Sequence, residues 1–370
     1  MKPDNDTWCP IMTKEVKMSK KIYIVSQLGV SNAGGVEKVS YYLNELLKEK
    51  YDVEIIKRGK LSFGKLNNLI QPVLISLRLY FKRNKFVIGN SWHCFLYLAD
   101  ISIHHGTSAG IMKYTGEGGF ALKLTAWMEK ISARRAKNVL AVSENCKKEL
   151  VELYKIPEEK ITVINNFVQD EVFYPKNDVS EQTEAGSREI NVCFSGALCY
   201  KKGIDKLLEF SDYIENEILP ENQSVIKLNI ATNYEKNAAP FLGRKNTSVQ
   251  TGLTASQMPD FYRQNDILFF PTRYEGFSMA ALEAVSSGLC LAGTNFAVSP
   301  ELQNFDFCKL LAIETPPAQI VELVRDLYGK FNSQQARLTI HDTVKEQFGT
   351  EQYRKKILSF VDEILSNNVL

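Results

Sequence analysis

Short apolar runs rich in β-branched residues alternate with longer segments of helical periodicity along most of this 370-residue chain. Runs of strand length between amphipathic helices predict a parallel sheet covered on both faces, which is typical of the α/β class. Ten runs are predicted as strands: 21–27, 52–56, 85–90, 100–105, 138–143, 161–165, 190–196, 225–232, 266–271 and 289–293.

A polar stretch interrupts the alternation once and divides the strands into two series. We interpret it as a linker between two doubly wound Rossmann-like domains that face each other across a cleft. The chain is expected to end in two helices, at about 317–329 and 345–366. The predicted parts are a loose tail (1–19), an N-terminal domain (20–175), the linker (176–188), a C-terminal domain (189–345) and a last segment (346–370) that packs back on the N-terminal domain.

Charge and cysteine content narrow the class of protein. Residues 1–170 carry 26 basic and 17 acidic side chains, whereas residues 171–370 carry 19 and 26, so the two halves are expected to meet different partners. The seven cysteines are scattered and the four histidines lack zinc-ligand spacing, which predicts no metal and a reducing cytoplasm. The first nineteen residues are too polar for a signal peptide, and the most apolar stretch, Leu69–Phe81, is too short and interrupted to span a bilayer.

The segment 267–288 carries the pattern that says most about chemistry. A buried strand ends at Pro271, Ser278 stands where a helix N-cap belongs, and Gly288 stands where the helix should end. Ligands of α/β sheets bind at the carboxyl ends of strands, so the N–H groups of residues 277–279 are expected to face an anion, most simply a phosphate.

Two carboxylates flank this predicted phosphate site, Glu275 in the loop and Glu283 in the helix. Such a pair suits hydroxyl groups, those of a sugar on one side and those of a ribose on the other. The alternative is a capped helix that carries two surface glutamates.

The Glu275–Glu283 pair resembles the Glu-x7-Glu motif of glycosyltransferase family 4, the retaining GT-B enzymes also called glycosyl transferases group 1. The similarity covers about residues 20–305. Five further blocks resemble the family in the family's order: 34–47, 141–150, 163–175, 194–210 and 252–271.

The resemblance implies transfer of a sugar from a nucleotide-diphosphate sugar, with a UDP-sugar as the first expectation, to a glycan or lipid-linked acceptor. It implies a metal-independent hexosyltransferase without a cofactor. The C-terminal domain would bind the donor and the N-terminal domain the acceptor. Family membership further implies a role in bacterial surface polysaccharide, such as lipopolysaccharide or capsule.

By the same resemblance, the catalytic residues are Glu275, His105 and Lys202. Glu275 would hold the sugar near its anomeric carbon, and Lys202 would neutralise the diphosphate leaving group. Glu283 would bind the ribose hydroxyls. The other expected donor-binding residues are Gly276, Phe277, Ser278, Met279, Gly196, Lys201, Gly252 and Leu253.

Histidines and glycines of the N-terminal domain have alternative interpretations. His105, at the end of a strand, is favoured over His104 as the histidine that approaches the sugar across the cleft; a core or capping histidine is the alternative. His93 is expected to be structural. Gly34 and Gly35 would let the backbone approach the acceptor or the diphosphate, or they simply form a turn between strand and helix.

Several positions depart from the family pattern. Ala197 stands where the family has an arginine, and Lys201 can replace that charge only in part, since lysine lacks the bidentate geometry. Phe167 and Gln169 replace a glycine and an aspartate, and residues 231–233 lack the usual Gly-x-Gly. These departures support a second hypothesis, a catalytically impaired partner subunit or acceptor-binding module. A GT-B epimerase or phosphorylase would need different catalytic residues.

A basic segment, residues 57–85, contains eight lysines and arginines and no acidic residue, with apolar side chains between them. This composition predicts binding to an anionic membrane surface, which would place the protein peripherally on the inner face of the cell membrane. The alternative is an ordinary helix with a solvated basic side. No nucleic-acid-binding motif accompanies the segment, so no nucleic-acid partner is expected.

Overall fold

The computed structural model describes residues 20–26, 35–57, 59, 67–176, 189–217 and 224–367. The predicted tail, Gly34 and the predicted linker from residue 177 onward lie outside these residues, as does part of the basic segment.

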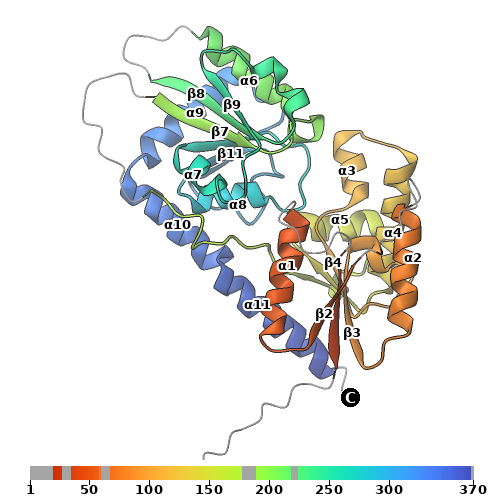
Figure 1. The fold of residues 1–370 in the computed structure, drawn as a ribbon. Helices are drawn as coiled ribbons and strands as arrows, with labels where there is room; N and C mark the ends of the chain where they lie inside the picture. Colours follow the sequence, from red (N-terminus) through yellow and green to blue (C-terminus); the bar gives the residue numbers. More distant parts are fainter. Residues whose placement is uncertain are drawn as a thin grey trace, which may run out of the picture.

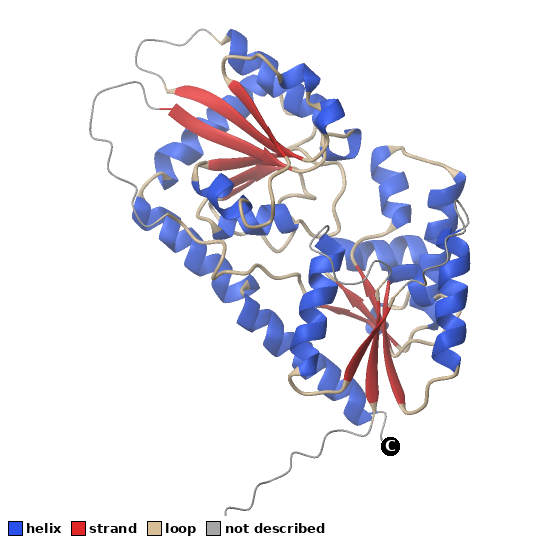
Figure 2. Ribbon diagram, viewed as in Figure 1, coloured by secondary structure: helices blue, strands red, loops and turns tan. Residues whose placement is uncertain are grey.

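Two lobes, each built on a six-stranded parallel sheet, make up the described part of the chain (Figures 1 and 2). The predicted fold class is therefore confirmed. The first sheet has the order β2-β1-β3-β4-β5-β6 and the second the order β12-β11-β10-β7-β8-β9. The strands of the first lobe are β1 (Lys21–Val25), β2 (Val53–Ile56), β3 (Lys85–Asn90), β4 (Ile101–His104), β5 (Asn138–Ala141) and β6 (Ile161–Val163). Those of the second are β7 (Glu189–Ser195), β8 (Val225–Thr232), β9 (Thr247–Thr251), β10 (Ile267–Phe270), β11 (Cys290–Gly293) and β12 (Cys308–Leu310).

Helices cover both faces of each sheet, as the apolar strands require (Figure 2). In the first lobe they are α1 (Gly35–Lys48), α2 (Asn67–Tyr80), α3 (Ser108–Thr115), α4 (Phe120–Arg135) and α5 (Glu144–Tyr154). In the second they are α6 (Ile204–Asn216), α7 (Met258–Arg263), α8 (Met279–Ser286) and α9 (Pro317–Phe331), followed by α10 (Gln334–Phe348) and α11 (Thr350–Asn367). Within the described residues, no helix combines the length and apolar character needed to cross a bilayer.

The sequence missed two strands, β9 and β12, which both lie at edges of the second sheet. An edge strand is half-exposed and needs few apolar residues. Only the first residue of β9 is buried, and β12 is three residues long, so neither produces a clear apolar run.

Three helices end the chain where the sequence predicts two: α9 and α11 correspond to the predicted 317–329 and 345–366, and α10 lies between them. Helix α10 was missed since its sequence is mostly polar, and Gly349 separates it from α11. Val168 pairs with Gly349, and the amide of Val168 donates to the carbonyl of Phe348 at 2.8 Å. A side chain at Gly349 would place its Cβ only 2.5 Å from the Lys345 carbonyl oxygen, so the close turn requires glycine.

Helix α11 leaves the second lobe and runs along the first, beside α1 and β2 (Figure 1). Arg354 forms an ion pair with Glu49 at 2.6 Å, and Lys50 forms one with Asp362 at 2.7 Å. The ring of Tyr353 stacks on Phe167 with 4.6 Å between centroids. One apolar cluster contains buried residues of both sheets, α10 and α11, and so joins the lobes. A second, smaller cluster lies between the first sheet and α2.

Candidate active site

A cavity of about 380 Å³ lies between the lobes, at the carboxyl ends of the strands of the first sheet. The first lobe contributes mainly residues that follow β3 and β4, and the second contributes the loop that follows β10. Several of its lining residues are predicted site residues: His105, Lys201, Glu275 and Gly276.

The loop after β10 is fastened to the first lobe by Tyr274, whose side chain is buried. Its hydroxyl accepts a hydrogen bond from the amide of Thr107 at 2.5 Å and donates to the Glu149 carboxylate at 2.8 Å. Burial raises the pKa of Glu149 to about 7, against the opposing effect of the hydrogen bonds that it accepts. On the other side of Glu275, the Gly276 carbonyl accepts from the Ser143 hydroxyl at 2.5 Å. Glu275 is thus held between two contacts to the opposite lobe.

Glu275 and Lys202 form an ion pair beside the cavity, with side chains that are 20 % and 17 % exposed. Lys202 ends the short 3-10 helix η4 (Tyr200–Lys202). Burial and the charge of Lys201 lower the pKa of Lys202 to about 7. A carboxylate in contact with a lysine favours the charged ammonium, and Glu275 makes such a contact. The structure therefore brings together two of the three predicted catalytic residues.

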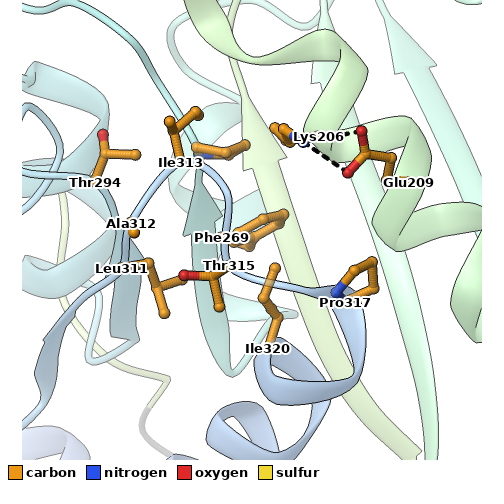
Figure 3. A pocket seen from close by; sticks show the side chains of 12 residues that line it. Lys206, Glu209, Phe269, Thr294, Leu311, Ala312, Ile313, Thr315, Pro317 and Ile320 are labelled. Carbon is orange, nitrogen blue, oxygen red and sulfur yellow. Dashed lines mark hydrogen bonds and ion pairs between the residues drawn. The ribbon is translucent and has the colours of Figure 1, made fainter.

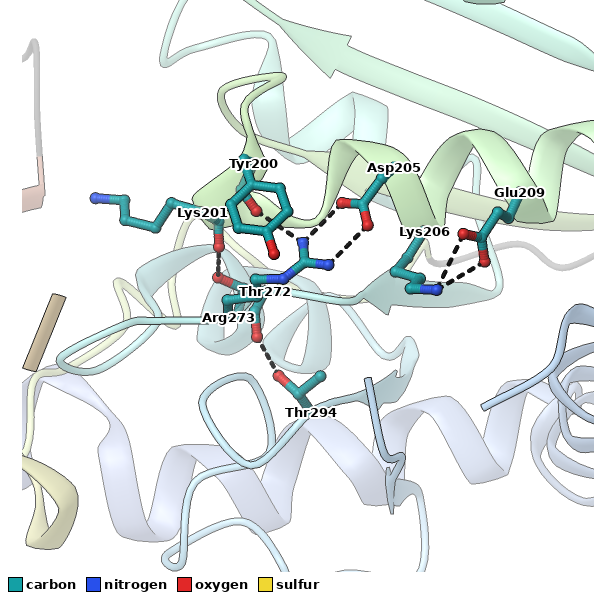
Figure 4. A network of polar contacts seen from close by, with 8 residues as sticks. All are labelled: Tyr200, Lys201, Asp205, Lys206, Glu209, Thr272, Arg273 and Thr294. Atoms are coloured by element: carbon teal, nitrogen blue, oxygen red, sulfur yellow. Dashed lines mark hydrogen bonds and ion pairs between the residues drawn. The ribbon is translucent and has the colours of Figure 1, made fainter. Parts of the chain in front are cut away.

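A network of polar contacts holds the loop that carries Lys201 and Lys202 (Figure 4). Arg273 binds Asp205 through two contacts of 2.7 Å, and its guanidinium lies 3.8 Å from the centre of the Tyr200 ring. The Arg273 amide also donates to the carbonyl of Lys201 at 2.8 Å. The Lys201 side chain points away from this network in Figure 4. These contacts fix the lysine loop relative to the loop of Glu275.

Two further cavities border residues of this network. One, of about 850 Å³, is lined by Tyr200 and Arg273 together with Tyr114 of the first lobe. The other, of about 10 Å³, is shown in Figure 3, with the Lys206–Glu209 ion pair at its edge. The smaller one has room for no more than about one water molecule and is not a ligand site.

Glu283 lies in α8, and its buried carboxylate meets a cation of the opposite lobe. Lys38 of α1 approaches it to 3.2 Å. Burial raises the pKa of Glu283, and the Lys38 ammonium opposes that effect. Lys38 was not predicted as a site residue, although it lies just after the glycine pair in a block that resembles the family.

The helix that carries Glu283 begins as expected. The Ser278 hydroxyl accepts a hydrogen bond from the Ala281 amide at 3.2 Å, which confirms the predicted N-cap. Gly288 has a φ of 84° just after the helix, the left-handed conformation that glycine favours. Phe277 is buried against Phe348, and Met279 is the first residue of the helix. Their contact with a phosphate stays a prediction.

The three histidines of the first lobe lie in three different environments. His104 is fully buried and pairs with the Ser102 hydroxyl at 3.0 Å, so it is a core residue. His93 lies with Nδ1 2.5 Å from the carbonyl oxygen of Asn90. His105 lines the cavity, and burial followed by the charge of His93 lowers its pKa to about 4, which keeps it neutral near pH 7.

The remaining predicted residues lie at the edges of the sheets where ligands of this fold class bind. Gly196 follows β7, and Gly252 and Leu253 follow β9, at the carboxyl edge of the second sheet. Gly35 begins α1.

Comparisons with known proteins show the family to which the chain belongs. A family profile described as "Glycosyltransferase Family 4" matches residues 33–172, and one described as "Glycosyl transferases group 1" matches residues 175–339. The chain belongs to glycosyltransferase family 4. It is therefore a glycosyltransferase with the GT-B fold, as the sequence resemblance implied.

One relative and two solved structures match this glycosyltransferase over most of its length. "Capsular polysaccharide biosynthesis glycosyltransferase CapM" of Staphylococcus aureus is 25 % identical over 304 residues, which cover 77 % of this chain and 76 % of CapM. A solved sucrose-phosphate synthase from Thermosynechococcus elongatus has a TM-score of 0.72 at 15 % identity and covers 94 % of this chain and 100 % of its own. HepE from Anabaena, solved with UDP and glucose, has a TM-score of 0.68 at 12 % identity, with coverages of 93 % and 100 %.

The close approach at Gly276 yields a prediction for the glycosyltransferase. A Cβ at this position would lie 1.9 Å from the carbonyl oxygen of His105, so Gly276→Ala fits only if the lobes separate. We expect a larger radius of gyration in small-angle scattering and a fall in kcat/KM of about 10- to 100-fold. Gly118→Ala is the control, because a Cβ there meets nothing within 4 Å. Equal activity of the two variants would contradict the close packing of Gly276 against the His105 carbonyl.

Proposed function

We propose that this glycosyltransferase is a retaining hexosyltransferase that moves a sugar from a nucleotide-diphosphate donor, first of all a UDP-sugar, to a glycan or lipid-linked acceptor. The observation that carries the proposal is the contact of Glu275 with Lys202 beside a cavity between two Rossmann-like lobes. Glu283, the proposed ribose ligand, lies on the helix that follows the same loop.

The chemistry of the leaving group explains this arrangement. Breaking the sugar–phosphate bond leaves negative charge on the diphosphate, and cations that are already in place stabilise it. Lys202 is largely shielded from water, so its ammonium would act with little screening. The N-terminus of α8 adds the partial positive charge of its amides. We propose that the donor sugar binds Glu275 and that its diphosphate binds Lys202.

The biological setting of the proposal is bacterial surface polysaccharide, made on the cytoplasmic side of the membrane. CapM, whose printed description is capsular polysaccharide biosynthesis, supports the setting, and HepE with UDP and glucose supports the donor class. Within the described residues, no observation favours the alternative of an impaired partner subunit. That alternative rests on Ala197, which stands where the family has an arginine. Lys201 and Lys202, close by in the sequence, supply positive charge in its place.

Binding of nucleotides tests the donor site. Glu283→Ala removes hydrogen bonds to a charged group and should weaken binding of the preferred nucleotide about 10- to 100-fold. Glu275→Ala should reduce kcat much more than it reduces that affinity. Calorimetric titration with UDP, GDP, ADP and CMP measures the affinities.

The control for both variants is Glu322→Ala, which removes an exposed glutamate of α9. Unchanged nucleotide affinity in Glu283→Ala would eliminate the ribose role. Equal losses of affinity and turnover in Glu275→Ala would reduce Glu275 to a binding residue.

Metal independence is a second prediction. Lys202 and the α8 amides supply the positive charge that a divalent cation supplies in other transferases. Transfer measured in EDTA should therefore equal transfer measured with Mg²⁺ or Mn²⁺ within about twofold, a difference too small to signal a lost electrostatic contribution to the transition state. Loss of activity in EDTA with rescue by Mn²⁺ would refute the proposal.

We also propose that the end of α2 binds anionic membranes. Leu77, Tyr80 and Phe81 are 50 %, 58 % and 86 % exposed, next to Arg78 and the cations that follow Phe81. Exposed apolar side chains among cations suit the interface of an anionic bilayer. This surface lies where α2 leads into the amino end of β3, at the opposite end of the sheet from the cavity.

Sedimentation with vesicles measures this membrane binding. Phe81→Glu should lower binding to vesicles rich in phosphatidylglycerol about tenfold or more, since it removes an apolar anchor and adds repulsion. Phe120→Glu is the matched control, because Phe120 is 83 % exposed but begins α4, at the opposite end of the first lobe. Equal binding to neutral and anionic vesicles would contradict the prediction.

A further inference from the structure

A chain of hydrogen bonds runs from His105 to the backbone of α1. Nε2 of His105 lies 3.2 Å from Oδ1 of Asn90, at the end of β3. Nδ2 of Asn90 lies 2.7 Å from the Ser40 hydroxyl, and that hydroxyl lies 2.8 Å from the carbonyl oxygen of Val36. Asn90 and Ser40 are 3 % and 2 % exposed, so water does not compete for these groups.

The Val36 carbonyl, the last group in this chain, determines which group donates and which accepts in every hydrogen bond of the chain. A carbonyl oxygen only accepts, so the Ser40 hydroxyl donates to Val36 and uses a lone pair to accept from Asn90. The Asn90 amide therefore turns its NH₂ group toward Ser40 and its oxygen toward His105. An amide oxygen also only accepts, so Nε2 of His105 must carry a proton.

The protonation state of Nδ1, the other ring nitrogen of His105, follows from the charge of the ring. Burial and the neighbouring His93 hold the pKa of His105 at about 4, so the ring is neutral near pH 7 and carries one proton. That proton is on Nε2, which leaves Nδ1 as a bare lone pair. Nδ1 has no hydrogen-bond partner among the described residues, and His105 lines the interlobe cavity.

We propose that Asn90 and Ser40 are positioning residues that lock His105 in the Nε2–H tautomer, so that its Nδ1 accepts a hydrogen bond from one hydroxyl of the sugar substrate. The assignment of that hydroxyl to a sugar rests on the proposed function; the tautomer does not. A substrate that presents an acceptor-only oxygen there, such as a carboxylate or a fully ionised phosphate, would face a lone pair and be rejected.

Long-range ¹H–¹⁵N spectra of protein labelled with ¹⁵N-histidine test the tautomer directly. The ¹⁵N chemical shift of a ring nitrogen that carries a proton differs from that of a ring nitrogen without one. The sequence has four histidines, and His105→Gln identifies the His105 signals. The wild type at pH 7 should show His105 protonated only at Nε2. A His105 signal with the proton on Nδ1, or a doubly protonated ring, would overturn the proposal.

The relay itself is tested by Ser40→Ala, which frees the Asn90 amide to rotate. We expect the His105 signals to shift toward a mixture of tautomers. Ser76→Ala is the matched control, because Ser76 is also 2 % exposed in a helix and donates to the carbonyl four residues earlier, at 2.8 Å. A folded Ser40→Ala variant with the pure wild-type tautomer would refute the role of Ser40.

Monodeoxy analogues of the accepted donor and acceptor test the substrate hydroxyl. One analogue should lose about two- to tenfold in kcat/KM with the wild type, and this loss should vanish in His105→Ala. If no analogue couples to His105, the recognition step fails while the tautomer stands. If the spectra show the Nε2–H tautomer but no sugar transfer is found with any donor, the proposed function fails and the role of Asn90 and Ser40 in setting the tautomer remains.

Discussion

The buried contact of Tyr274 with the first lobe is the interaction on which the site depends. It joins a loop of the second sheet to Thr107 and Glu149, which follow strands of the first. Glu275 is the next residue, so the same contact decides where the proposed sugar-binding carboxylate lies. A buried phenol without partners would be costly, and the interface therefore favours one arrangement of the lobes.

The opposite net charges of the two halves of the chain agree with this packing of one lobe on the other. The basic half of the chain provides Lys38, and the more acidic half provides Glu283, which Lys38 meets across the interface. Within the second lobe, Lys202 and Glu275 form a second ion pair. Both carboxylates of the proposed donor site therefore have a cationic partner in this structure.

The first lobe contributes a site that is already oriented. Asn90 ends β3 and His105 directly follows β4, and the hydrogen-bond chain through Ser40 determines which ring nitrogen of His105 faces a ligand. The neighbouring His104, one residue earlier on the strand, points into the core instead, as alternation along a strand requires. The strand thus separates a structural histidine from one that faces the cavity.

The sequence by itself determined the two parallel sheets, the capped helix after β10 and the positions of Glu275 and Glu283, because these features follow from periodicity and from motifs within a few residues. It did not predict β9 and β12, the edge strands of the second sheet, which bury too little. It also did not predict the break at Gly349, where Val168 pairs with the backbone from far along the chain. Lys38 and Glu283 are 245 residues apart in sequence. Only the packing of one lobe on the other could decide that they meet, since contacts between lobes depend on relative orientation and local patterns carry no information about it.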